Sequence, residues 1–222
     1  FLKIYFWQII SLFLNLGSMF IVTPYISSDV AVYGIYSVVI STSIFLSYAD
    51  LGFLSAGYKY AREYVAKNER DNEIKVIGFA GFIFLVFIIV YSLTLIGLSF
   101  NPSLLVKSLS SPTDIKTARN LLLIMACFAP VSVLQRIIQI VFSVRMEDYK
   151  FQRVFIFFNL IKILSVLYFF RNGKYQIVEY VVFSQLCNSA AVFVGYINAK
   201  RYFGYNIFKL FTSFRFSTEA FN

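Results

Sequence analysis

The stretch IKVIGFAGFIFLVFIIVYSLTLIGLSF, residues 74–100, decides the fold class of this chain. A helix needs about 20 consecutive apolar residues to cross the ~30 Å hydrocarbon core of a bilayer, and this stretch is longer than that. Its centre, residues 79–90, holds no polar side chain, so we expect much of this helix to face lipid. Five further apolar stretches accompany it, at residues 4–26, 30–54, 118–144, 151–170 and 177–199. The chain is therefore predicted to be an all-α, polytopic membrane protein, a bundle of about six transmembrane helices.

Composition agrees with this fold class. The chain is 59% hydrophobic, 20% aromatic and 14% charged, with a mean hydropathy of +0.73, whereas soluble domains carry about 25% charged residues. The longest connections, residues 58–75 and 101–117, are too short to fold alone, so we expect any function to lie inside the bundle. We interpret residues 58–75 as a polar surface connection that forms a short solvated helix and a turn. We assign residues 1–199 to one six-helix lobe and residues 200–222 to a cytoplasmic or interfacial tail, or a linker to a second lobe.

Basic residues are distributed unequally between the two ends of the predicted bundle. The richer end holds Lys3, Lys59, Arg62, Lys67, Arg70, Lys75, Arg145, Lys150, Arg153, Lys200, Arg201, Lys209 and Arg215. The poorer end holds Lys107, Lys116, Arg119, Arg171 and Lys174. The positive-inside rule assigns the richer end to the cytoplasm, which places both termini there. The net charge of +9 is then explained by membrane orientation rather than by a nucleic-acid partner.

The residue types exclude several kinds of chemistry. The chain has no histidine, which excludes histidine acid–base catalysis and histidine metal ligands. Cys127 and Cys187 fall inside predicted spans, where we interpret them as small core residues rather than as a disulfide. We therefore expect no metal and no cofactor.

Three ionisable side chains fall inside predicted spans, where a charge at the helix centre costs at least about 2.5–3.5 kcal/mol. Lys162 lies in the middle of its span with Asn159 on the same face, so we expect it to face a cavity and to pair with a carboxylate or with the substrate. Arg136 follows Pro130, which should kink its helix. It either faces the cavity or extends to the cytoplasmic headgroups. Asp50 caps a broken helix at the cytoplasmic end of the second span, or binds a coupling ion or proton.

Amide side chains recur at helical spacing in several of the predicted spans. Two interpretations stay open for them: hydrogen bonds between helices, and the lining of a polar cavity. Together with Lys162 and Arg136, the amides form the set of candidate substrate-binding residues. They are Gln8, Asn15, Gln139, Asn159, Gln185 and Asn188. A polar interior with two cations suits an anionic or amphiphilic substrate, such as phosphate attached to sugar.

Several segments, in order along most of the chain, form a pattern that a known family shares. They are QIISLFLN (8–15) followed by Pro24 and Tyr25, VYGIYS (32–37), YADLGF (48–53), YAREY (60–64) and residues 139–151. They resemble the polysaccharide transporter family, which comprises flippases for lipid-linked oligosaccharides such as O-antigen units. Members of this family belong to the superfamily of multidrug, oligosaccharidyl-lipid and polysaccharide exporters. They have twelve or more helices in two six-helix lobes, so this chain resembles an N-terminal lobe. Because it begins at Phe1 without a methionine, we expect it to be a fragment or one half of a larger transporter.

The resemblance implies transfer of an undecaprenyl-diphosphate-linked oligosaccharide across the bacterial inner membrane, by alternating access, for O-antigen, lipopolysaccharide or capsular polysaccharide assembly. It implies that Arg136 and Lys162 attract the diphosphate or acidic sugars, and that Asp50 shapes the cytoplasmic gate. The sugar path would be lined by Gln8, Asn15, Gln185 and Asn188. Membrane lipids, a second six-helix lobe and other polysaccharide-assembly proteins would be its partners.

Three other functions stay open, and one of them is a non-transporting assembly partner if the chain is a lone lobe. A cation-coupled multidrug exporter of the same superfamily would need acidic residues deep in the bundle, and Asp50 is the only candidate. A membrane enzyme of polysaccharide assembly would need catalytic carboxylates in an external loop, but the external connections offer only Asp29, Asp114 and Glu179 and no pair at catalytic spacing. We therefore expect a transporter rather than an enzyme.

Overall fold

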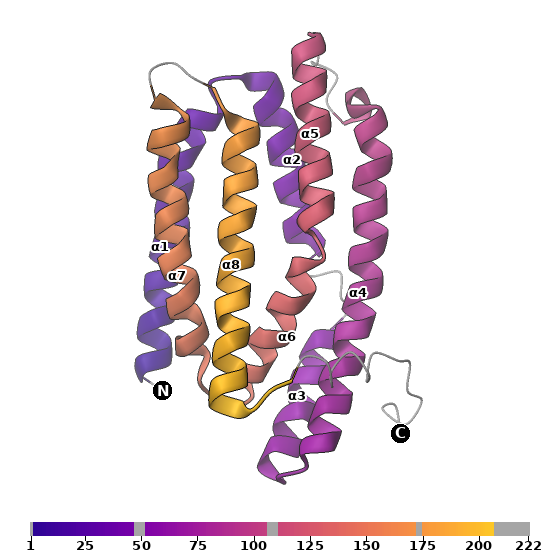
Figure 1. The fold of residues 1–222 in the computed structure, drawn as a ribbon, viewed down its shortest axis with the longest axis vertical. Helices are drawn as coiled ribbons and strands as arrows, with labels where there is room; N and C mark the ends of the chain where they lie inside the picture. The colour runs from indigo at the N-terminus through magenta and orange to yellow at the C-terminus, as the bar shows by residue number, and fades with distance from the viewer. Residues whose placement is uncertain (1, 47–51, 106–110, 172–174, 207–222) are drawn as a thin grey trace.

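The computed structural model describes residues 2–46, 52–105, 111–171 and 175–206, and in these ranges the chain is an all-α bundle without a strand (Figure 1). The helices are α1 Leu2–Ile26, α2 Val30–Leu46, α3 Phe53–Ala66, α4 Arg70–Phe100, η1 Pro102–Leu104, α5 Pro112–Phe128, α6 Val131–Ser143, α7 Asp148–Phe169 and α8 Ile177–Phe203. The predicted fold class is confirmed.

Four of these helices, α1, α4, α7 and α8, are long and apolar enough to cross a membrane, and α5 with α6 forms a fifth span if the bent pair is counted as one. The bend is 41° and confirms the kink predicted at Pro130, which has no N–H to donate and whose ring clashes with the preceding turn. The remaining predicted span, residues 30–54, contains α2, of which 17 residues are described, fewer than the roughly 20 that a span needs. Residues 47–51, which follow it, lie outside the described part of the chain. The chain is a helical membrane protein.

The predicted second span, residues 30–54, runs into the next helix at its end. α2 is described from Val30 to Leu46, residues 47–51 lie outside the described part of the chain, and Phe53 and Leu54 already belong to α3, which packs against α4 as a hairpin. Gly57 allows this close packing, because a Cβ there would lie 2.7 Å from the Cβ of Ala80. The connection 58–75 is therefore mostly helical.

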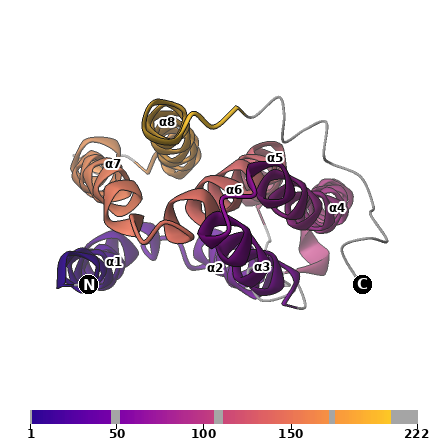
Figure 2. The same cartoon turned by 90° about the horizontal axis from the view of Figure 1, so that it is seen from below.

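The helices pair in an order that separates α1 from α2. α1 packs along α7, α7 along α8, and α8 against α5 and α6, whereas α2 packs on α5 and α4 carries α3. Figure 2 shows α1 and α7 at one side of the bundle and α3, α4 and α5 at the other. α1 and α2 are thus joined by the turn after Ile26 but have different partners along their lengths.

α4 is buried on part of its surface and exposed on the rest, where Val86, Ile89, Val90 and Leu93 are exposed apolar residues. That this exposed part faces lipid stays a prediction. In its most apolar window 39% of the residues are buried, against 11% in α1, which makes α4 the most buried of the four spans. Phe84 and Ile88 lie inside a core cluster that α3 and α6 complete. A helix that is apolar all round can lie in lipid or in a protein core, and α4 packs on α3, α5 and α6 over part of its surface.

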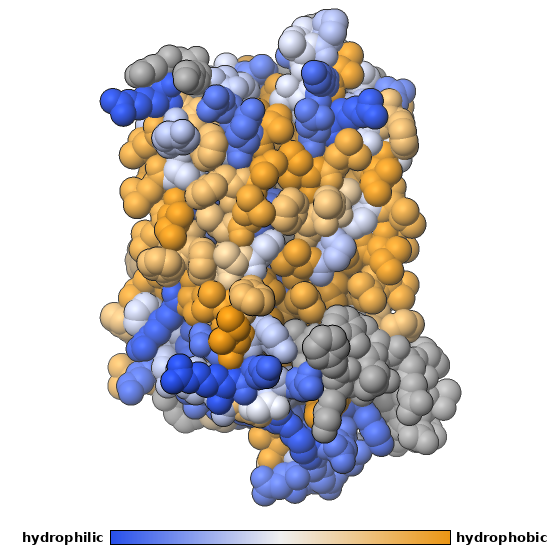
Figure 3. Space-filling view, in the orientation of Figure 1, coloured by the Kyte–Doolittle hydropathy of each residue, from blue (hydrophilic) through white to orange (hydrophobic). Residues whose placement is uncertain are grey.

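The surface is divided as a membrane protein requires. Figure 3 shows an apolar band between two hydrophilic ends. The described members of the richer basic set lie at the end that carries α3, where α7 begins and α8 ends (Figure 1). This distribution is the basis of the predicted orientation, with that end in the cytoplasm.

One acidic residue of the connection 58–75 is not on the surface, contrary to its interpretation as a polar surface segment. Glu73 is 2% exposed, and its carboxylate accepts hydrogen bonds from Arg145 at 2.8 and 3.0 Å, from Arg70 at 3.3 Å and from the Tyr205 hydroxyl at 3.3 Å. Arg70 also donates to the Phe203 carbonyl at 2.8 Å. Burial, with the adjacent Glu73 charge, raises the pKa of Tyr205, so its hydroxyl remains a donor. The cluster ties together α4, the α6–α7 turn and the end of α8.

Candidate functional site

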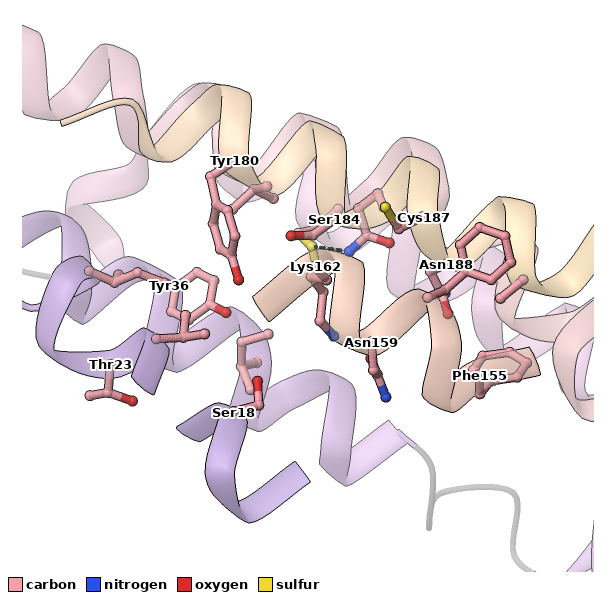
Figure 4. A pocket seen from close by; sticks show the side chains of 18 residues that line it. Ser18, Thr23, Tyr36, Phe155, Asn159, Lys162, Tyr180, Ser184, Cys187 and Asn188 are labelled. Atoms are coloured by element: carbon pink, nitrogen blue, oxygen red, sulfur yellow. Dashed lines mark hydrogen bonds between the residues drawn. The ribbon is translucent and has the colours of Figure 1, made fainter. Parts of the chain in front are cut away.

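Lys162 lies beside a cavity of about 300 Å³ formed by α1, α2, α7 and α8 with Met125 of α5. The side chain projects from well inside α7 toward the cavity (Figure 4). The ion pairs among the described residues involve Arg70, Arg145 and Lys150, so no carboxylate in the described part of the chain pairs with Lys162. A cation this far inside a bundle needs a counter-anion, and the cavity has room for one to bind.

Much of the rest of the lining consists of uncharged side chains that form hydrogen bonds. They are Ser18, Thr23, Tyr36, Asn159, Tyr180, Ser184, Gln185 and Asn188. Phe155 and Phe158 add aromatic surface. Hydroxyls and amides both donate and accept hydrogen bonds, so this lining can bind an anion at Lys162 and hydroxyl groups around it.

A second cavity, about 210 Å³, adjoins the first and shares Met125, Gln185 and Asn188 with it. Its cation is Arg136, whose guanidinium donates to the Gln139 side-chain oxygen at 3.3 Å. The bend at the α5–α6 junction points α6 away from the axis of α5, and Arg136 lies on the part beyond the bend. The two amides of α8 therefore stand between the two cationic side chains.

A third cavity, about 220 Å³, continues from Arg136 toward α3 and is also lined by Gln139, Ser55 and Tyr58. The Tyr58 hydroxyl donates to the Ser143 carbonyl at 3.3 Å and holds α3 against the end of α6. Because neighbouring cavities share lining residues, the three form a polar series from α1 and α7 to α3 and α6.

The structure brings six of the predicted residues together along this series. They are Asn159, Lys162, Gln185 and Asn188 in the first cavity, and Arg136 and Gln139 in the others. For Arg136, the cavity position agrees with one of the two interpretations that the sequence left open.

Two of the other three predicted residues, Gln8 and Asn15, are not found along the series. Gln8 and Asn15 are exposed on α1 and line none of these cavities, because α1 packs on α7 and leaves most of its surface open. Asn15 instead meets α7, where its side-chain oxygen accepts from Asn159 at 3.5 Å. Their assignment to the sugar path is thus not supported by their positions. Asp50 lies outside the described residues.

Sequence reasoning missed the tyrosines of the site. Tyr36 and Tyr180 face the first cavity (Figure 4) and Tyr58 the third. Tyrosine is common in apolar spans, so composition alone did not distinguish these three. The spacing of Tyr180, Ser184 and Asn188 was the available signal, since residues four apart share one helix face.

The first cavity is closed at the end where α1 turns into α2. The Tyr175 hydroxyl donates to the Ile26 carbonyl at 2.8 Å, and the rings of Tyr25 and Phe170 lie 6.1 Å apart. Burial raises the pKa of Tyr175, so the hydroxyl keeps its proton and the hydrogen bond. These contacts fix the α1–α2 turn against the α7–α8 connection.

Comparison with protein-family models, with curated proteins and with solved structures gives no match for this chain.

Proposed function

We propose that this chain is part of a flippase that moves an undecaprenyl-diphosphate-linked oligosaccharide across the bacterial inner membrane for O-antigen or capsular polysaccharide assembly. The observation that carries the proposal is Lys162, a cation inside the bundle without a described carboxylate partner, beside a 300 Å³ cavity lined by amides and hydroxyls. Such a site provides charge for a phosphate and hydrogen bonds for a sugar.

The second cation supports a substrate that carries more than one phosphate group, such as a diphosphate. Arg136 follows Lys162 along the series of cavities, with Gln185 and Asn188 shared between their cavities. A guanidinium binds phosphate oxygens in bidentate fashion, and an ammonium binds them as a point charge. A headgroup can therefore pass from one cation to the other while the amides keep it hydrogen-bonded.

The charge of the lining favours this proposal over a cation-coupled drug exporter. The described residues that line the three cavities include Lys162 and Arg136 but no aspartate or glutamate. Binding of a coupling cation or of a cationic drug there would place positive charges together in a medium of low dielectric constant.

The proposed mechanism is alternating access, in which two lobes rock about the bound headgroup. No covalent bond is made or broken, so the role of the protein is to bind and release the headgroup. A second six-helix lobe completes the transporter, both termini are cytoplasmic, and other polysaccharide-assembly proteins use the flipped product.

The test is export of surface polysaccharide in a bacterial host that lacks its own flippase. We expect the full reading frame to restore export, and Lys162→Glu and Arg136→Glu to abolish it, because a carboxylate repels the diphosphate. Lys162→Arg keeps the charge and should retain part of the export. Lys200→Glu changes an exposed lysine at the end of α8 and is the matched control. Normal export by Lys162→Glu would refute the proposal.

A further inference from the structure

Burial along α1 and α2 changes with distance from the turn that joins them. Near the turn, Val22 and Ile26 of α1 and Val32 and Ile35 of α2 are buried in one core cluster. Farther along α1, Ser18 is half-buried, and α1 as a whole has buried residues only at its turn end. Hence α1 and α2 meet at the turn and then separate.

The Lys162 cavity lies in the space where they separate. Ser18 lines it from α1 and Ile40 from α2, and both are half-buried. The opposite wall is α8, where Val181, Cys187 and Ala191 are buried. The cavity therefore has a closed back wall and a partly exposed front.

The two ends of the cavity differ in the same way. Toward the turn it is closed by Val22 and Ile26, and Ile26 is fixed by its hydrogen bond with Tyr175. Away from the turn, toward the end rich in basic residues, its lining includes the half-buried Phe155, Phe158 and Asn159.

We infer that the entrance to the Lys162 cavity is the gap between α1 and α2, bounded by Ser18 and Ile40, and that it opens toward the basic end of the molecule. The ligand is the phosphate-bearing headgroup of an anionic amphiphile. The identity of this ligand rests on the proposed function, but the position of the entrance does not. An anion that enters there is attracted by the basic end, reaches Lys162, and is stopped by the closed end beyond it.

The competing entrance is the third cavity, at the other end of the polar series, where Ser55 is exposed beside Arg136. An anion entering there would pass Arg136 before it reached Gln185, Asn188 and Lys162. The two routes can be told apart by the helices on which a bulky side chain blocks entry: α1 and α2 for the first route, and α3 for the second.

The chain carries its own reporter for this test. Its two cysteines are Cys187, which lines the cavity and is 8% exposed, and Cys127, which is exposed elsewhere on the bundle. In a Cys127→Ser background, modification of the protein by a small anionic methanethiosulfonate reagent measures access to the cavity. The reaction is followed by intact-protein mass spectrometry on the full chain in membrane vesicles.

We expect Ser18→Trp and Ile40→Trp to slow modification of Cys187 by about tenfold or more, the effect of a barrier increase near 1.4 kcal/mol. Leu16→Trp is the matched control, because Leu16 is exposed on the same helix and lies about 200° around it from Ser18. It should react at the parental rate. The reagent should act faster from the face of the membrane that exposes the basic end.

Three results would overturn the inference. Cys187 could be unreactive in the Cys127→Ser parent, which would mean that the cavity has no open entrance. Ser55→Trp could slow the reaction while the α1 and α2 variants do not, which would assign entry to the third cavity. Equal rates in all variants would place the entrance at neither site. Because modification needs no transport, failure of the proposed flippase function would leave these outcomes unchanged.

Discussion

Lys162 and Cys187 line the same cavity, so the charge of one controls which reagents reach the other. In the Cys127→Ser background we expect an anionic methanethiosulfonate to modify Cys187 faster than a cationic reagent of similar size. Lys162→Gln removes the only charge among the described lining residues of this cavity. It should lower the anion-to-cation rate ratio by about tenfold, since charges interact strongly at low effective dielectric constant.

Lys150→Gln is the control for this prediction. Lys150 is paired with Glu147 at the start of α7 and does not line the cavity. Its loss should leave the rate ratio at the parental value. If the anion-to-cation rate ratio of the Lys162→Gln protein equalled that of the parent, Lys162 would not set the electrostatic potential in the cavity.

Glu73 is the residue on which a second set of contacts depends. Glu73→Ala would leave Arg145, whose side chain is 15% exposed, without its carboxylate. Removing one partner of a buried ion pair costs about 3–5 kcal/mol. We expect a lower midpoint of thermal unfolding for the detergent-solubilised protein. Glu63→Ala, which changes an exposed residue of α3, should unfold like the parent, and an unchanged midpoint for Glu73→Ala would contradict this account of the cluster.

At the scale of helices, the sequence predicted the features that depend on local chemistry. The bend at Pro130 and the long apolar helices follow from residue type and run length. The α3–α4 hairpin was predicted only in part: the polar connection indicated a short helix and a turn, but not that this helix packs along α4. Which side of α4 is buried could not be predicted, because hydropathy does not distinguish contact with lipid from contact with protein.

The candidate site was predictable only in part, for a related reason. Helical spacing shows which residues share a face of a helix, but not which neighbour that face meets. Lys162 and Asn188 lie on helices with neighbours on several sides, so their polar faces border a cavity. Gln8 belongs to α1, which packs along α7, and its polar face remains exposed. Pairing between helices is a property of the tertiary structure.

The hairpin of α3 and α4 gives the prediction at this scale. A Cβ at Gly57 would lie 2.7 Å from the Cβ of Ala80, whereas a Cβ at Gly97 would have nothing within 4 Å. Gly57→Ala must therefore push α3 away from α4 and weaken the contact of Tyr58 with Ser143. We expect a lower thermal midpoint for Gly57→Ala, because overpacking costs about 1–3 kcal/mol.

Gly97→Ala is the matched control within α4. It makes the same chemical change in open space and improves helix propensity by up to about 1 kcal/mol. Its midpoint should equal or exceed that of the parent. If both variants behaved alike, the close approach of α3 to α4 would not be a determinant of stability.

For the whole molecule, the distribution of charge and the path of the chain are linked. Basic residues gather where α1 begins, where α3 and α4 meet and where α8 ends. The same end faces the proposed entrance to the Lys162 cavity. If this end is cytoplasmic, the site is open to the side of the membrane on which lipid-linked precursors are made in the proposed pathway. The face of the membrane that each connection reaches is set by the number of crossings before it. The proposed orientation, and with it the proposed function, can therefore be tested by counting those crossings.

The number of crossings can be measured with four single-cysteine variants in a Cys127→Ser/Cys187→Ser background, which removes both native cysteines. Each new cysteine stands at an exposed position: Ser28, Lys67, Thr113 and Arg201. With six crossings, Ser28→Cys and Thr113→Cys should react with an impermeant thiol reagent from the outside, and Lys67→Cys and Arg201→Cys from the cytoplasm. The decisive pair is Ser28 and Lys67, which lie on either side of α2. If α2 does not cross, both react from the same face, and the short α2 is a membrane-buried segment rather than a span. If all four sides are reversed, the richer basic end is external and the proposed entrance faces away from the precursor.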